Sequence, residues 1–281
     1  MRHDSIVLRY ARSFSRYTDP GEYARYFASI PDSISDVCRL IKSQLIHPAA
    51  RERFKGQLPE DRTDEDRRFI TVVDMLEALL ERNASGLTEE RPPSDRLIVS
   101  CRFHALLLAS IMKYKAVPCR VRAGFASYLV NGKFIDHWIC EVWDQLLARW
   151  RLVDADIWMS LEVLGVDFDP ADVPRDKFVT AGSAWLAGRD SVIDPELYGI
   201  RDWWGMYYIR DQMSHDVECL RNNERTYTDL PVVSTKPYDG MSLHELGEID
   251  RTAEMLSSPD RNFRRILNIG WTRNDAHAIS A

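Results

Sequence analysis

The chain has 281 residues, which is enough for one large domain or two modest ones. Hydrophobic residues make up 45% of it and charged residues 28%, a composition typical of globular proteins that excludes a disordered chain. The formal net charge of -6 gives no electrostatic basis for binding nucleic acid or an anionic membrane, so neither is expected as a partner.

The sequence favours a cytoplasmic protein without a metal. The N-terminal segment MRHDSIVLRYARSFSRY lacks the apolar stretch of a secretory signal, and no run approaches the roughly 20 apolar residues that span a bilayer. The five cysteines are odd in number and scattered, which fits a reducing compartment. His137 and Cys140 form an H-x-x-C pair, but side chains three positions apart in a strand point to opposite faces. No metal or other cofactor is therefore expected.

Residues 1–95 are predicted to be mostly helical. The segment 35–47 carries apolar residues close to helical spacing, and Pro48 ends it. The segment 63–83 begins with acidic residues, as suits a helix N-terminus, and continues with apolar residues at three-and-four spacing. The charged segment 86–95, which contains two prolines, is predicted to be a loop.

The next part, residues 96–160, combines a helix with strands. The segment CRFHALLLASIMKYKAV (101–117) is apolar on nearly every face, which indicates a central buried helix. A tight turn is predicted at Asn131 and Gly132. A helix followed by an antiparallel sheet is an α+β pattern. The alternating segments predict strands over 119–130, 133–144 and 149–156.

The C-terminal part, residues 161–281, is mixed and rich in helices. Helices are predicted in the second half of 202–223 and over 242–256. No internal repeat, low-complexity tract or strong linker divides the chain. We therefore expect a single domain over residues 1–281, made of a helical part (1–95), a catalytic core (96–160) and this C-terminal part.

Cys101 is the candidate nucleophile. It stands where the segment LIVS gives way to the apolar helix, so the free amides and partial positive charge of a helix N-terminus would stabilise its thiolate. The same amides would bind the oxyanion that forms when a carbonyl is attacked. The alternative interpretation is an inert core thiol, because cysteines are often buried.

His137 and Asp154 complete a set of thiolate, imidazole and carboxylate with Cys101. His137 lies in the middle of the predicted return strand, a rigid mount for a base that must reach the thiol. Asp154 lies on the next predicted strand, where a cross-strand pair suits a carboxylate–imidazole hydrogen bond. Asp156 has the same side-chain parity and is the alternative carboxylate. Asp136 points to the other face and is expected to be a surface residue or a turn ligand.

These segments resemble the transglutaminase-like superfamily of cysteine hydrolases and acyltransferases. The segment AVPCRVRAGF (116–125) is similar to a family motif, and over residues 90–160 the chain resembles a group of bacterial proteins of similar length. The resemblance implies a papain/transglutaminase-like core, with the cysteine helix packed on an antiparallel sheet and extra helices at both ends. The matching residues, in chain order, are Cys101 heading a helix, His137 and Trp138 on a strand, and Trp150 to Asp154 on the next.

The chain departs from that group directly after the cysteine. Where the group has Cys-Arg-Asp-Phe, this chain has Cys101, Arg102, Phe103 and His104, which leaves the choice of substrate open. No upstream Trp or Gln is identified that completes the oxyanion hole of some members. Only the backbone N–H of Cys101 is assigned to that hole.

Six further side chains are candidates for contact with substrate. His104 lies one helical turn from Cys101, and its alternative role is that of a satisfied histidine beside the core. The aromatic cluster 203–208 would line an acyl-binding cleft or, alternatively, fill a core. The charged groups of 210–216 would bind substrate or form a solvated face. The six candidates are His104, Trp138, Asp156, Trp204, Arg210 and His215.

The predicted activity is cysteine-dependent acyl transfer or hydrolysis at an amide, ester or thioester carbonyl, through an acyl-enzyme on Cys101. The substrate would be a small molecule, a peptide or a carrier-bound acyl group. One alternative is an enzyme similar to arylamine N-acetyltransferases, although these usually carry an RGG-x-C-x-E motif that is absent here. The other is a non-catalytic binding protein on a transglutaminase-like scaffold.

Overall fold

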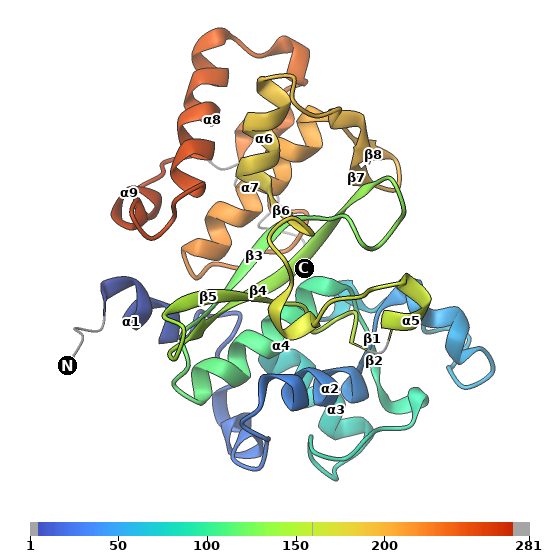
Figure 1. Ribbon diagram of the computed structural model, residues 1–281. Coiled ribbons are helices and arrows are strands. Elements are labelled where there is room, and N and C mark those ends of the chain that lie inside the picture. The colour runs from blue at the N-terminus through green and yellow to red at the C-terminus, as the bar shows by residue number, and fades with distance from the viewer. Residues whose placement is uncertain (1–4, 159, 272–281) are drawn as a thin grey trace. The chain divides into compact units, whose positions relative to one another are not determined.

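The computed structural model describes residues 5–158 and 160–271 (Figure 1). It combines helices with a mixed sheet, so the predicted α+β class is confirmed. The chain forms two compact units whose ranges interleave. This interleaving explains why the sequence shows no linker between them. Unit 1 is Met1–Val121 with Trp138–Pro174, and unit 2 is Arg122–His137 with Arg175–Ala281.

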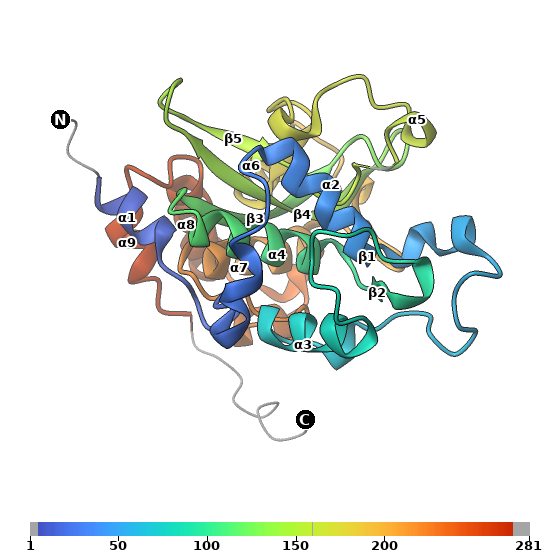
Figure 2. The same cartoon turned by 90° about the horizontal axis from the view of Figure 1, so that it is seen from below.

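Unit 1 is built around helix α4 (Cys101–Tyr114), on which every residue from Cys101 to Lys113 is buried. This confirms the central helix expected from its apolar sequence. The other helices of unit 1 are α1 (Ile6–Arg12), α2 (Ile34–Gln44), α3 (Val72–Arg82) and the short α5 (Leu161–Leu164). Helices α1, α2 and α3 pack against α4 (Figures 1 and 2).

Two predicted helices of unit 1 have different ends in the structure. Helix α3 begins at Val72, not near residue 63, because Thr71 and Asp74 form a capping box. Helix α2 ends at Gln44, before the predicted end at residue 47, because the next two residues pair as a strand. Helical periodicity does not reveal such a change when apolar residues continue through it.

A two-stranded parallel pair follows α2 and precedes α4. Strand β1 (Leu45–Ile46) pairs with β2 (Leu97–Ile98), and the two lie side by side (Figure 2). The Val99 N–H donates to the Ile46 carbonyl at 2.9 Å. Parallel strands run in the same direction, so the segments that leave β1 and β2 emerge at the same edge. His47 leaves one strand there, and Cys101 is reached from the other.

The larger sheet has the strand order β6-β3-β4-β7-β8, with β5 also paired to β4. The sheet is mixed: β4 and β5 pair antiparallel as predicted, whereas β7, a strand that was not predicted, pairs parallel to β4. A long connection separates these two strands and lets the chain return in the same direction. The strands are β3 (Cys119–Ala126), β4 (Phe134–Asp144), β5 (Arg149–Val153), β6 (Phe178–Thr180), β7 (Tyr198–Ile200) and β8 (Trp203–Trp204).

The turn between β3 and β4 is longer than the predicted two-residue turn. It occupies residues 127–133, because β3 ends at Ala126 and β4 begins at Phe134. Gly132 adopts a left-handed conformation there, with φ +74°, and its lack of a Cβ suits that conformation.

Unit 2 contains the helices α6 (Ala181–Arg189), α7 (Met206–Leu220), α8 (Leu243–Leu256) and α9 (Phe263–Leu267). The helices predicted in 202–223 and 242–256 are confirmed as α7 and α8. They pack with α6 around an apolar core that includes Trp185, Met213 and Ile249. Among the described residues, no helix has the length and apolar character needed to cross a membrane.

Candidate functional site

Cys101 is the first residue of α4, as predicted, and is 5% exposed. Ser100 precedes it in an extended conformation, and its side chain makes no capping hydrogen bond to the first turn. The Ser100 N–H donates to Asp66 Oδ1 at 2.8 Å, which holds the entry to the helix. The thiol therefore lies at the positive end of a buried helix, where a thiolate is favoured.

His47 contacts Cys101 within unit 1, a relationship that the sequence does not predict. The Cys101 side chain is close enough to be one of the groups that raise the pKa of His47. His47 Nδ1 accepts the Ala49 N–H at 3.1 Å, and Nε2 lies 3.6 Å from Asp156 Oδ2. Burial lowers the pKa of His47, but the Asp156 carboxylate and the nearby Cys101 side chain outweigh this effect and raise that pKa.

Asp156 is the centre of a buried polar cluster, which consists of Lys42, His47, His104 and Asp156. Lys42 Nζ donates to Asp156 Oδ1 at 2.9 Å and lies 3.3 Å from His104 Nε2. Both side chains of the Lys42–Asp156 pair are only 6% exposed. The cluster brings together two of the candidate residues, His104 and Asp156, and adds Lys42 and His47, which the sequence did not predict.

The tautomer of His104 follows from its partners. Its Nδ1 lies 3.1 Å from the Ser100 carbonyl, which can only accept, so the proton is on Nδ1. Nε2 then accepts from the Lys42 ammonium. Burial, with a further contribution from Lys42, lowers the pKa of His104 to about 3, so the ring is neutral. These contacts favour the interpretation of His104 as a satisfied histidine beside the core over its interpretation as a residue that contacts substrate.

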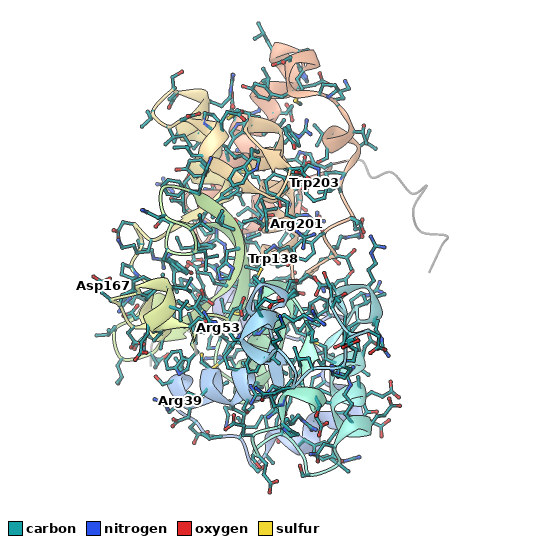
Figure 3. The ribbon with its side chains drawn as sticks, turned by 90° about the vertical axis from the view of Figure 1, so that its right-hand side faces the viewer. Arg39, Arg53, Trp138, Asp167, Arg201 and Trp203 are labelled. Carbon is teal, nitrogen blue, oxygen red and sulfur yellow. The ribbon has the colours of Figure 1, made fainter. Side chains whose placement is uncertain are left out.

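The segment that carries Asp154 and Asp156 is held in place by two arginines of unit 1, both labelled in Figure 3. Arg39 lies over the Trp158 ring, with 5.6 Å from its guanidinium carbon to the ring centre. Arg53 Nη1 donates to Ser160 Oγ at 2.9 Å. Both contacts are made just after Asp156, so they hold the chain that follows the two carboxylates.

Asp154 lies directly after β5, which ends at Val153. The last paired residues of β4 and β5 are Cys140 and Val153, and the Asp154 N–H donates instead to the Pro170 carbonyl at 2.8 Å. Asp154 thus lies one residue beyond the last paired residues of β4 and β5, and its role as the partner of His137 stays a prediction. Asp154 Oδ1 accepts the Asp156 N–H at 2.8 Å and so holds the turn after the strand.

His137 lies on β4, as the sequence predicts, and is buried. Within unit 2 its ring packs edge-on against Tyr128, with 6.1 Å between ring centres. Trp138, the next residue of the strand, is 1% exposed and belongs to unit 1. Such a position gives the imidazole the rigid mount that a catalytic base needs.

Asp136 is buried, so the expectation of a surface position is wrong. Helix α7 covers this carboxyl: the Tyr208 hydroxyl donates to Oδ2 at 2.5 Å, and Gln212 donates to Oδ1. Burial raises the pKa of Asp136 to about 6, against the opposing effects of Tyr208, His137 and Gln212.

Trp204 lies on β8 in unit 2. Its Nε1–H donates to the Arg201 carbonyl at 2.6 Å, and Lys133 Nζ lies 4.7 Å from its ring centre. Its neighbour Trp203 is 54% exposed, and both Arg201 and Trp203 are labelled in Figure 3. The cluster is thus partly at the surface, and its role as a wall for an acyl group stays a prediction.

Arg210 and His215 lie on α7 and are buried. Arg210 donates to the carbonyls of Ser234 and Lys236, at 2.9 and 2.7 Å, which ties the following loop to the helix. His215 packs edge-on against Tyr227. These contacts are structural, and contact of either side chain with substrate stays a prediction.

Two other cysteines of unit 1 provide a contrast with Cys101. Cys140 is buried on β4, and its thiol donates to the Ala105 carbonyl at 3.2 Å. Burial raises the pKa of Cys140 and of Cys38 well above the ordinary value. Raised pKa values keep both thiols protonated and unreactive at neutral pH.

Lys42 and His47 are the site residues that sequence reasoning missed. Lys42 carried a signal: it lies on the apolar face of its helix, between Cys38 and Leu45, where a charged residue needs a buried partner. His47 carried none, because its position depends on the parallel pairing of β1 with a strand far along the chain. Over residues 5–158 and 160–271, no group of three or more His, Cys, Asp and Glu side chains is arranged to hold a metal ion.

Comparisons with known proteins do not assign a family. No family model matches the chain, and no curated protein matches it. A solved structure that matches is a protein from Cytophaga hutchinsonii described as a "putative cysteine protease", with 17% sequence identity and a TM-score of 0.34. The match covers 63% of this chain and 46% of that one, so this chain corresponds to less than half of that protein's length.

Proposed function

We propose that this chain is a cysteine-dependent enzyme with a papain/transglutaminase-like core, which attacks amide, ester or thioester carbonyls through Cys101. The observation that carries the proposal is the position of Cys101 at the start of the buried helix α4, beyond the strand that pairs with the segment of His47. A thiol there is stabilised as the thiolate by the first-turn amides. The raised pKa values of Cys38 and Cys140 give those thiols no such activation.

The proposed reaction has two halves. His137 accepts the Cys101 proton, Sγ forms a bond to the carbonyl carbon, and the carbonyl electron pair moves to oxygen. The carbonyl then re-forms, and the leaving group departs with the proton from His137, which leaves an acyl-thioester on Cys101. Water or an amine attacks that thioester in the second half and restores the thiol.

Asp154 is the proposed partner that orients His137. The register supports this choice: one step beyond its last pair, Asp154 would stand opposite Ile139, and His137 shares the face of Ile139 on β4. The alternative carboxylate, Asp156, is already held by Lys42. That ion pair favours a structural role for Asp156.

The proposed substrate is a small molecule, a peptide or a carrier-bound acyl group. The chemistry needs no metal or organic cofactor, because nucleophile, base and oxyanion donors are all protein groups. Trp138, Trp204, Arg210 and His215 remain the proposed substrate contacts, with His104 and Asp156 less favoured because their atoms are engaged in the polar cluster.

Trapping of the acyl-enzyme tests the proposal. Incubation with p-nitrophenyl acetate should release a stoichiometric burst of p-nitrophenolate and leave an acetyl group on the Cys101 peptide, as mapped by mass spectrometry. Cys101→Ala should abolish the burst, whereas the matched variant Cys140→Ala should retain it. A burst that persists in Cys101→Ala would refute the proposed nucleophile.

A further inference from the structure

We propose that His47 is a catalytic residue that donates a hydrogen bond from Nε2 to the oxyanion formed at Cys101. This assignment rests on the proposed function of Cys101 and supplies the side-chain donor that completes its oxyanion hole. Three features of unit 1 carry it: the strand pairing that brings the two residues together, the tautomer of His47, and its exposure.

The strand pairing places His47 beside the nucleophile. β1 and β2 are parallel, Ile46 pairs with Ile98, and the Val99 N–H bonds to the Ile46 carbonyl at 2.9 Å. His47 follows β1 directly, and Cys101 lies two residues beyond Val99. Backbone pairing therefore fixes the distance between the imidazole and the thiol, so the donor needs no reorganisation when charge develops.

The tautomer makes His47 a donor and not a base. Nδ1 accepts the Ala49 N–H at 3.1 Å, so the ring hydrogen of the neutral form is on Nε2. To act as a base toward Cys101, neutral His47 would need an unprotonated Nε2, and its ring hydrogen would then be on Nδ1. That hydrogen would point at the Ala49 N–H, which is also a donor. Protonation of the ring would add a hydrogen at Nδ1, against the Ala49 N–H, and would leave the Nε2 hydrogen in place. In either charge state, Nε2 offers a hydrogen toward Cys101, and the task of the base falls to His137.

Asp156 orients the ring without taking its hydrogen. Its Oδ2 lies 3.6 Å from His47 Nε2, beyond hydrogen-bond range, while its Oδ1 is bound by Lys42 at 2.9 Å. The negative charge of Asp156 is thus balanced by Lys42. When Sγ bonds to the carbonyl carbon, the sulfur loses its thiolate charge, and the neighbouring oxygen becomes the stronger acceptor for the Nε2 hydrogen.

Exposure distinguishes His47 from the rest of the polar cluster. Its side chain is 29% exposed, whereas those of Lys42, Asp156 and His104 are at most 6% exposed. A substrate can therefore meet His47 from solvent. His104, by contrast, is the structural histidine, with both nitrogens bonded inside the unit.

Two matched substitutions separate the functions of the two ring nitrogens. His47→Asn keeps a side-chain acceptor for the Ala49 N–H, as asparagine is a favoured residue at such a cap, but removes the donor at the position of Nε2. His47→Gln retains an N–H donor near that position and has no basic group. Both variants are measured with two probes: acylation by p-nitrophenyl acetate, which forms an oxyanion, and alkylation by iodoacetamide, which does not.

We expect His47→Asn to slow acylation by about 100- to 1,000-fold, because it removes one donor to the oxyanion. We expect His47→Gln to slow acylation by less than about tenfold, because it retains that donor. Alkylation of Cys101, measured on the alkaline plateau where the thiol is fully ionised, should change by less than about threefold in both. Acylation of His47→Asn at the wild-type rate would overturn the assignment, as would an equal loss in His47→Gln or a parallel loss of alkylation.

The same measurements separate this assignment from the proposed function. If wild-type Cys101 is alkylated but never acylated, carbonyl attack itself is refuted and the role of His47 fails with it. If wild type is acylated and His47→Asn is unaffected, only the role of His47 fails.

Discussion

Lys42 and Asp156 form a buried ion pair that joins helix α2 to the segment after β5, with 2.9 Å between Nζ and Oδ1. The burial of these charges is tolerated because each has its partner and a further polar neighbour, which is His104 for Lys42 and His47 for Asp156. The pair thus supports two residues beside Cys101 while taking no part in the proposed chemistry.

Removal of one charge from this pair should be costly. Lys42→Met leaves Asp156 uncompensated, and we expect its free energy of unfolding to fall by about 3–5 kcal/mol, as for other broken buried pairs. The double variant Lys42→Met/Asp156→Leu removes both charges and should recover most of that loss. Urea unfolding monitored by circular dichroism measures both values. A double variant as unstable as the single one would show that the ion pair is not the cause.

The two carboxylates after β5 should differ in what they control. Asp154→Asn retains an oxygen that accepts the Asp156 N–H, so stability should change little, while acylation of Cys101 should fall by at least about 100-fold if the carboxylate orients the base. Asp156→Asn should lower stability more than activity, because it removes the charge paired with Lys42. The measurement is the burst rate of each variant, normalised to the amount of folded protein. A larger loss of acylation rate in Asp156→Asn than in Asp154→Asn would show that Asp156 is the carboxylate that orients the base.

Asp136 should make stability depend on pH. Burial raises its pKa in the folded state from 3.8 to about 6, so between these values the folded state holds a proton that the unfolded state has lost. The free energy of unfolding should therefore decrease as pH rises from about 4 to about 6, by about 3 kcal/mol for a shift of this size. Asp136→Asn should lack this component. Denaturant titrations at several pH values compare the two proteins, and identical slopes would contradict the raised pKa.

Much of the candidate site can be predicted from the sequence, because the elements that carry it depend on the local spacing of apolar residues. The apolar run after Cys101 predicts a buried helix, and alternation predicts the strand that carries His137. Both elements are present with close to the predicted bounds. The α7 and α8 helices follow from the same periodicity.

Contacts between segments that are distant in the chain could not be predicted from the sequence. The contact of His47 with Cys101 depends on β1 and β2, which are two-residue strands too short for any periodic signal. The burial of Asp136 depends on the covering helix α7, seventy or so residues further along the chain. The end of β5 at Val153, which separates Asp154 from the strand pairing, is set by the competing Pro170 carbonyl.

The central claim, that Cys101 is an activated nucleophile, is tested most directly by its rate of alkylation. Iodoacetamide labelling at pH 7, with each cysteine mapped by mass spectrometry, should modify Cys101 well before Cys140. The substitution His137→Ala should lower the rate at which Cys101 is alkylated without altering the exposure of its side chain. Equal labelling of Cys101 and Cys140, or an unchanged Cys101 rate in His137→Ala, would contradict the account.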